Sequence, residues 1–219
     1  MLPDGGTPLA AAAAVALLAL YMRAVDRPGA VVGFVVAACL AAGAGWTGFV
    51  LIFLLVAVGT ATSRRGQRQR RPIQVLCNGG VGAVAALAYG WGISWGMAAA
   101  TGALGAALSD TVSGELGRRG GRTRLLLFGP EVPAGRDGGM TWFGTLTGLF
   151  AAALLPATAF AFGSFALRPA LVIAGAAMAG NLLDSLAGAT LQPHLGPRGN
   201  DWVNLMATAS AAVLAAALA

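Results

Sequence analysis

Long apolar runs that carry almost no charge dominate this sequence, and they restrict the fold more than any other feature. Apolar residues make up 57% of the chain and charged residues only 10%, which leaves too few charges to cover the surface of a water-soluble domain. The abundant glycine and alanine suit membrane helices, because small residues let neighbouring backbones approach closely. The composition therefore predicts an all-α fold, a polytopic transmembrane helix bundle in which residues 1–219 form one integral-membrane domain.

Apolar runs long enough to cross about 30 Å of hydrocarbon define the expected spans. They lie near residues 8–25, 30–44, 46–62, 73–91, 93–116, 142–163, 168–190 and 201–218. Gly43, Gly45 and Trp46 mark either a tight turn between the second and third spans or a bend in one long helix. The first run lacks the basic segment that precedes a cleaved signal sequence, so it counts as a span. The sequence predicts seven or eight spans.

The basic residues give the expected bundle an orientation. All fourteen are arginines, and with eight spans and the N-terminus outside, only Arg168 falls in an outer loop. This asymmetry is typical of multi-pass proteins, whose cytoplasmic loops collect the positive charge. We therefore expect a protein of the cell membrane, inner or plasma. The net charge of +6 resides in these loops and indicates contact with the lipid bilayer, with no nucleic-acid partner.

Polar side chains gather at the cytoplasmic ends of these spans, although apolar runs and arginines alone define the topology. Gln74 and Asn78 open the fourth span, and Asp110 and Glu115 close the fifth. Further polar positions close the seventh span with a spacing of three and four residues, which places them on one helical face, and others open the eighth. These positions are Asn181, Asp184, Ser185, Gly188, Gln192, Asn200, Asp201 and Asn204. The sequence predicts a site at one cytoplasmic rim.

Two aspartates carry the most weight in this rim, because an ionised Asp within a span costs about 3 kcal/mol. Asp110 and Asp184 open related pentapeptides, "DTVSG" and "DSLAG". Carboxylates suit Mg²⁺, which takes one or two of them and completes its shell with water and substrate phosphates. His194 is the only histidine and the two cysteines lack metal-ligand spacing, which argues against zinc. Glu115, beside Arg118, has a competing interpretation as a side chain that extends to the interface.

Five blocks in order identify a family resemblance. "RPIQVLCNGG", "SDTVSGELG", "VPAGRDGGMTWFGTLTG", "NLLDSLAGATLQ" and "NDWVNLMAT" resemble the integral-membrane family called domain of unknown function 92, which includes transmembrane protein 19 and the plant phytyl-phosphate kinase. The resemblance runs from about Arg70 to the C-terminus. It divides the domain into N-terminal helices, residues 1–69, and a family-like catalytic core, residues 70–219.

The resemblance implies an isoprenyl-phosphate kinase. The expected reaction converts an isoprenyl monophosphate, of the phytyl or geranylgeranyl type, to its diphosphate with a nucleoside triphosphate, expected to be CTP. The family's motif positions carry over to Gln74, Asn78, Asp110, Thr111, Glu115, Pro133, Gly135, Gly138, Gly139, Asn181, Asp184, Ser185, Gln192, Asn200, Asp201 and Asn204. Ser109 departs from the usual Ala, and Arg136 and Asp137 stand where small or polar residues are more usual. Prenyl chain length, nucleotide and oligomeric state stay open.

The residues and the resemblance predict the same mechanism, since phosphoryl transfer requires mainly positioning and charge neutralisation. We expect Asp110 and Asp184 to hold Mg²⁺ on the donor phosphates, with Asp201 and Glu115 as a further ligand or as support. Amides at the rim would orient phosphate oxygens or metal-bound water, and arginines would neutralise phosphate. The amides are Asn78, Asn181 and Asn204, and the arginines are Arg70, Arg71, Arg118, Arg119 and Arg136. The loop 129–141 would cover the site, with the prenyl tail between helices.

Three other functions compete with this interpretation. An ion-coupled transporter or flippase of an anionic lipid or metabolite would also place acids in membrane helices. It would need polar residues at the membrane centre, whereas these gather toward one face, which favours an enzyme. A prenyltransferase would need paired aspartates, as in DDxxD or NDxxD, and "NDWVN" ends in Asn where the second aspartate would stand. A structural scaffold would not need the clustered Asp and Asn residues.

Overall fold

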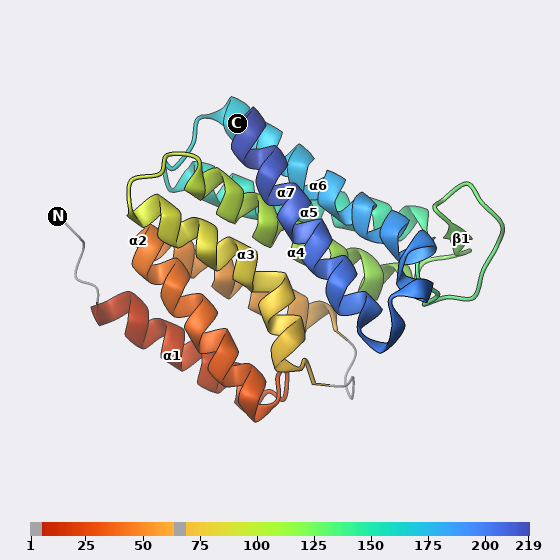
Figure 1. Ribbon diagram of the computed structural model, residues 1–219, viewed down its shortest axis with the longest axis horizontal. Helices are drawn as coiled ribbons and strands as arrows, with labels where there is room; N and C mark the ends of the chain where they lie inside the picture. Colours follow the sequence, from red (N-terminus) through yellow and green to blue (C-terminus); the bar gives the residue numbers. More distant parts are fainter. Residues whose placement is uncertain (1–5, 64–68) are drawn as a thin grey trace.

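The computed structural model describes residues 6–63 and 69–219, and these form a helix bundle with a short β-hairpin at one end (Figure 1). The helices are α1 (Gly6–Tyr21), α2 (Arg27–Thr62), α3 (Pro72–Gly90), α4 (Gly96–Gly117), α5 (Trp142–Ala161), α6 (Leu167–Thr190) and α7 (Gly199–Leu218). This architecture confirms the predicted all-α membrane bundle. Three arginines of the second expected inner loop, Arg64, Arg65 and Arg68, lie outside the described residues.

Helix α2 contains the second and third expected spans and reverses direction at Gly45. The backbone there leaves the helical region, with φ 59° and ψ −142°, values that glycine adopts readily because it has no Cβ. A Cβ on Gly48 would collide with the carbonyl oxygen of Leu40, so the two halves of α2 lie side by side. The glycine-rich segment at 43–45 is therefore a tight turn between two antiparallel halves.

Both ends of α2 consequently lie at the same end of the bundle, where Arg70 contacts them. The Asp26 amide donates to the Arg70 carbonyl oxygen at 3.3 Å, and Arg70 Nη2 donates to the carbonyl oxygen of Gly59 at 3.3 Å. Asp26 also caps the start of α2, because its Oδ1 accepts the Gly29 amide at 2.7 Å.

Helix α4 is the central helix, with every residue from Gly96 to Ser109 buried. It packs against α2, α3, α5, α6 and α7. Glycine permits the close approach: a Cβ on Gly102 would lie 2.7 Å from the Ala215 Cβ of α7, and one on Gly105 would lie 2.9 Å from the Ala177 Cβ of α6.

Five helical segments of the described chain are long and apolar enough to cross a membrane: α2, α3, α5, α6 and the segment Gly196–Leu218. Helix α4 is absent from this group although we expected a span at 93–116. Its interior position explains the difference, since a helix surrounded by protein needs small residues more than lipid-facing leucines. Helix α1 has only 16 residues. The count of seven or eight spans stays a prediction.

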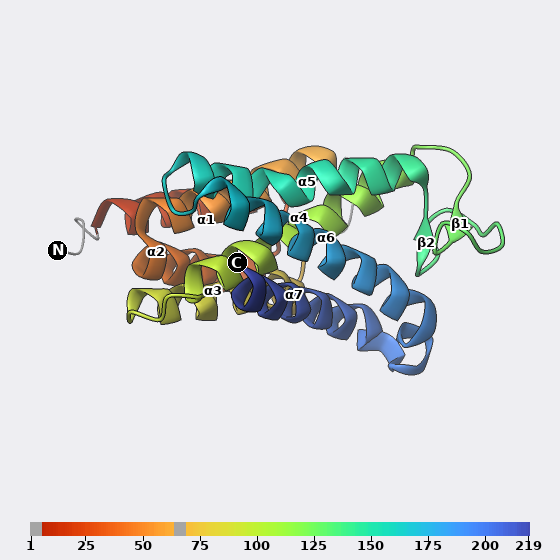
Figure 2. The same cartoon turned by 90° about the horizontal axis from the view of Figure 1, so that it is seen from above.

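The polar segments meet at one end of the bundle, toward the right of Figure 1. Helices α3, α5 and α7 begin there, and α4 and α6 end there. The loop after α4 carries strands β1 (Arg124–Leu125) and β2 (Gly139–Met140), which pair antiparallel and project beyond the start of α5 (Figure 2). Two 3-10 turns, η1 (Gln192–His194) and η2 (Gly196–Arg198), connect α6 to α7. We call this end the polar rim.

Candidate functional site

The two aspartates predicted to matter most contact each other at the polar rim. Asp110 lies near the end of α4 and Asp184 near the end of α6, and their carboxyl groups are close enough to share a hydrogen bond. The Oδ1 atom of Asp184 is buried and has no hydrogen-bond partner among the described residues. Two carboxylates in contact repel when both are ionised, so they need a proton or a cation between them.

A buried polar network holds the helices that carry this pair. Asn181 Nδ2 donates to Ser109 Oγ at 2.8 Å, and Ser109 Oγ donates to the carbonyl oxygen of Gly148 at 2.8 Å. Ser113 Oγ lies 3.3 Å from Asn181 Oδ1. These contacts join α4, α5 and α6 one turn from the aspartates and fix the rotation of the helices that present them.

The aspartates line a cavity of about 140 Å³ that we call the aspartate cavity. Its wall combines the ends of α4 and α6, the start of α5 and the loop 129–141, which we call the glycine-rich loop. The residues predicted for the site that line it are Asp110, Arg118, Gly135, Arg136, Gly138, Gly139, Asn181, Asp184 and Ser185. Carboxylates, arginines and loop backbone therefore face one space, as a site for a metal-bound polyphosphate requires.

The glycine-rich loop packs tightly on α6 beside this cavity. Gly138 has φ +71°, and a Cβ there would lie 2.7 Å from the Ala189 Cα. The Gly138 amide nitrogen would in turn lie 3.2 Å from a Cβ on Gly188. Both the backbone conformation and the close approach require glycine at 138, so the loop is fixed against the helix that carries Asp184.

We predict that Gly138→Ala releases this loop. The substitution strains a positive-φ residue by about 1 kcal/mol and also collides with the Ala189 backbone. Gly121→Ala is the matched control, because Gly121 has φ +87° and open space around it. Trypsin should cleave after Arg136 faster in Gly138→Ala than in Gly121→Ala or the unmodified protein. Equal cleavage rates in the two variants would contradict the docking of the loop.

Glu115 lies between two arginines rather than in the aspartate cavity. It is 7% exposed, and its Oε1 lies 3.8 Å from Arg118 Nη1. It also interacts electrostatically with Arg70. Burial lowers the pKa of the Arg70 guanidinium below its usual value, and the negative charge of Glu115 acts in the opposite direction. Glu115 thus balances two cations of the rim, and its side chain does not extend to solvent.

Asp201 forms a separate ion pair with Arg71. Its Oδ2 lies 3.3 Å from Arg71 Nη2, and the Asp201 side chain is 5% exposed. Asp201 does not line the aspartate cavity. Across the described residues, no group of three or more His, Cys, Asp and Glu side chains is arranged to hold a metal ion. The structure thus brings together two of the three predicted metal ligands, Asp110 and Asp184, and places the third beside an arginine.

The other predicted residues divide into two groups. Arg70, Asn78 and Thr111 line a second, apolar cavity. The remainder line neither cavity: Gln74, Arg119, Gln192, Asn200 and Asn204. Two of these have structural contacts. Gln74 Oε1 accepts the Arg71 amide at 3.0 Å and caps α3, and Arg119 Nη2 donates to the Thr62 carbonyl oxygen at 2.8 Å.

Several residues of the aspartate cavity and its support were not among the predicted site residues, and four of them carry polar side chains of interest. Asp137 and Thr145 line the cavity, and the negative charge of Asp137 acts on Asp184. Ser109 and Ser113 belong to the buried network. The departures from the family pattern at Ser109 and Asp137 were the available signal, because both place polar atoms where the resemblance expects other residues.

The residues present fit Mg²⁺ as the cation of this site. Mg²⁺ binds through one or two carboxylates and keeps several waters, and the contacting pair offers two carboxylates, one with an unpartnered buried oxygen. The described residues place no histidine or cysteine in the cavity wall, so the donor set is made of hard oxygen ligands.

Comparisons with known proteins extend the resemblance almost to the N-terminus. The family model described as integral membrane protein DUF92 matches residues 10–212. An uncharacterized membrane protein of Methanocaldococcus jannaschii is 30% identical over 208 residues, covering 89% of this chain and 85% of that protein. The Arabidopsis thaliana protein PGR is 30% identical over 217 residues, covering 81% of this chain and 75% of that protein.

A third relative matches a shorter part of the chain. The chloroplastic protein VTE6 of Arabidopsis thaliana is 36% identical over 102 residues, covering 45% of this chain and 31% of that protein. No solved structure shows a significant match to this chain. Because the family model covers, in whole or in part, all seven helices of the described residues, the chain belongs to the integral membrane protein family DUF92.

Proposed function

We propose that this protein is a membrane-embedded, Mg²⁺-dependent phosphotransferase. It converts an isoprenyl monophosphate, of the phytyl or geranylgeranyl type, to the diphosphate with a nucleoside triphosphate, expected to be CTP. The observation that carries the proposal is the contact between Asp110 and Asp184 in a cavity that arginines and a glycine-rich loop also line. The five sequence blocks that resemble this family support the substrate class.

The proposed reaction breaks the bond between the terminal phosphorus of the nucleotide and its bridging oxygen. A new bond forms between that phosphorus and an oxygen of the acceptor phosphate, and the nucleoside diphosphate leaves. The acceptor is already an anionic oxygen nucleophile at neutral pH, so the reaction needs no strong general base. This suits a cavity whose described wall holds carboxylates, amides, hydroxyls and arginines.

Several groups in the aspartate cavity have roles in this proposal. Asp110 and Asp184 would hold Mg²⁺, which when bound supplies charge neutralisation on the donor phosphates. Arg118 and Arg136 would bind phosphate oxygens through their forked N–H donors. The backbone N–H groups of the glycine-rich loop would add hydrogen bonds to the same oxygens. The rim would face the cytoplasm, where nucleotide is available, with the N-terminus outside.

A radiochemical assay tests this function. Purified protein in lipid nanodiscs should transfer the terminal phosphate of labelled CTP or ATP to phytyl or geranylgeranyl phosphate. The transfer should require Mg²⁺ and stop when EDTA is added, because the two carboxylates alone cannot bind the polyphosphate. Geranylgeraniol, which lacks the acceptor phosphate, is the control and should accept no label. Absence of transfer to every prenyl phosphate, together with substrate flux in proteoliposomes, would replace the enzyme with a transporter.

A further inference from the structure

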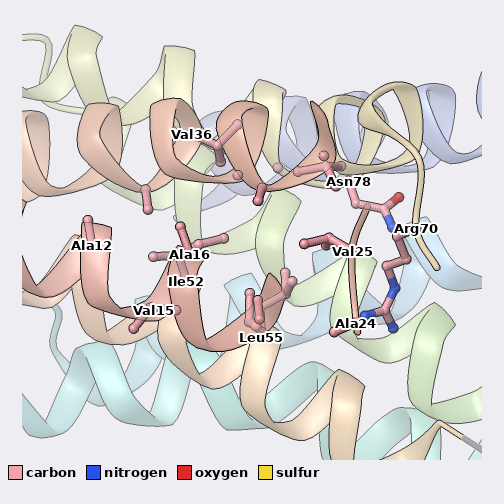
Figure 3. A pocket seen from close by; sticks show the side chains of 18 of the residues that line it. Ala12, Val15, Ala16, Ala24, Val25, Val36, Ile52, Leu55, Arg70 and Asn78 are labelled. Carbon is pink, nitrogen blue, oxygen red and sulfur yellow. The ribbon is translucent and has the colours of Figure 1, made fainter. Parts of the chain in front are cut away.

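A second cavity lies between α1, the two halves of α2 and α3 (Figure 3). Its volume is about 70 Å³, and its wall is apolar over most of its length, with Ala16, Gly33, Ile52 and Val75 among the lining residues. We call it the apolar cavity. Empty apolar cavities stay dry and bind hydrocarbons, so its natural occupant is an apolar group.

One end of the apolar cavity is polar and carries the Arg70 guanidinium, whose charge Glu115 partly balances. Arg70 and Asn78 lie together at this end, and Ala12 lies at the opposite end (Figure 3). Arg70 Nη2 donates to the Gly59 carbonyl oxygen at 3.3 Å and lies 3.4 Å from Ser63 Oγ, so the guanidinium is fixed in place. An arginine held at one end of an apolar cavity suits an amphiphile with an anionic head group and a hydrocarbon chain.

The same turn of α4 lines both cavities. Asp110 lines the aspartate cavity and its neighbour Thr111 lines the apolar cavity. Glu115, one turn further on, contacts Arg118 of the first cavity and interacts with Arg70 of the second. A head group bound at Arg70 would therefore lie beside the turn of α4 that presents Asp110.

We propose that the apolar cavity is the subsite for the acceptor lipid, an inference that rests on the proposed function. Arg70 and Asn78 bind the phosphate of the isoprenyl monophosphate, and the cavity takes the hydrocarbon next to that phosphate. A water-sized group needs about 10–15 Å³ of such volume, so the cavity holds about five carbon-sized groups, the size of one isoprene unit. The rest of the chain continues into the bilayer, and the cavity selects for the branched first unit rather than for chain length.

Gly33→Leu tests this subsite by filling it. A Cβ on Gly33 meets only Val75 Cγ1, at 3.8 Å, so the leucine enters the cavity without moving backbone. The matched control is Gly175→Leu on α6, where a Cβ meets nothing within 4 Å and the site borders neither cavity. We expect Gly33→Leu to raise the KM for geranylgeranyl phosphate about tenfold and to leave the KM for nucleotide unchanged. Gly175→Leu should match the unmodified protein in both constants.

Photolabelling gives a readout that does not depend on transfer. A geranylgeranyl phosphate analogue with a diazirine on its first isoprene unit should label α1 and α2 of the unmodified protein, and much less label should enter Gly33→Leu. Unlabelled geranylgeranyl phosphate should compete, whereas inorganic phosphate and phosphatidic acid should not. Competition by phosphatidic acid would assign the cavity to a membrane phospholipid instead.

The outcomes separate this inference from the proposed function. Transfer with an unchanged acceptor KM in Gly33→Leu would overturn the subsite and leave the kinase in place. Labelling of α1 and α2 that Gly33→Leu removes, in a protein that transfers no phosphate, would support the subsite and overturn the kinase. Labelling that is equal in Gly33→Leu and Gly175→Leu would overturn the subsite whatever the activity.

Discussion

Asp110→Asn and Asp184→Asn should each raise the melting temperature in EDTA while abolishing phosphate transfer. The gain in stability and the loss of activity follow from one geometry, the contact between two partly buried carboxyl groups. When no metal is bound, the pair must either take up a proton or keep two like charges in contact, and an asparagine in either position removes this cost, so the bundle without metal becomes more stable. The same substitution removes a ligand of the proposed Mg²⁺ site, so metal binding and transfer are lost.

Thermal unfolding in EDTA measures the change in melting temperature, and a Mg²⁺ titration of the same unfolding measures metal binding. At a Mg²⁺ concentration 100 times its Kd, binding should stabilise the unmodified protein by about 2.7 kcal/mol. Neither variant should respond to Mg²⁺ over the same range. The rate of transfer should fall at least about 1,000-fold, which corresponds to about 4 kcal/mol of lost transition-state stabilisation.

Glu131→Gln is the matched control for the loss of one carboxylate. Glu131 is exposed in the same loop region and does not line the aspartate cavity, so its variant should keep both the Mg²⁺ response and the transfer rate. Full activity in both aspartate variants would show that the pair holds no catalytic metal. A lower melting temperature in EDTA for both variants would show that the hydrogen bond between the two carboxyl groups outweighs the cost of proton uptake or charge repulsion in the metal-free protein.

Most helices of this bundle could be predicted from the sequence because they carry long apolar runs, many of whose residues lie on the outside of the bundle. The runs that predict spans at 73–91 and 142–163 become α3 (Pro72–Gly90) and α5 (Trp142–Ala161) almost unchanged. Hydropathy carries less information about α4, since a helix covered by protein on all sides is built of small residues. Its central position depends on tertiary packing, which no local pattern records.

Proximity of Asp110 and Asp184 could also be predicted, because two similar pentapeptides end two helices that run in the same direction. The rotation of each helix about its own axis could not be predicted. Asn78 and Thr111 belong to the predicted polar set, yet they line the apolar cavity and not the aspartate cavity that Asp184 lines. The sequence predicts that these residues lie at the same end of their helices. Which side of its helix each residue faces depends on the close glycine contacts between helices and on the Ser109–Asn181 hydrogen bond.

Arg71→Met should destabilise the protein, and adding Asp201→Asn should restore most of the loss. The Asp201 carboxylate is 5% exposed and its Oδ1 has no hydrogen-bond partner in the described part of the chain. Its charge is therefore balanced by Arg71 and by the N-terminal dipole of α7, whose first turn it occupies. Without Arg71, the buried Asp201 carboxylate would lose its paired cation. Removing one partner of a buried ion pair is strongly destabilising, because the remaining charge is poorly compensated.

Arg71 is 46% exposed, so water also solvates its charge and the ion pair contributes less to stability than a fully buried pair. We therefore expect Arg71→Met to cost about 2 kcal/mol of stability, rather than the about 3–5 kcal/mol lost when a buried pair is broken. Asp201→Asn alone should cost less, since it leaves only a half-exposed arginine. Denaturant unfolding of the two single variants and the double variant completes a double-mutant cycle. A double variant less stable than either single one would show that Asp201 has partners beyond Arg71. If Asp201→Asn removed the response to Mg²⁺, the carboxylate would join Asp110 and Asp184 as a ligand, which its pairing with Arg71 argues against.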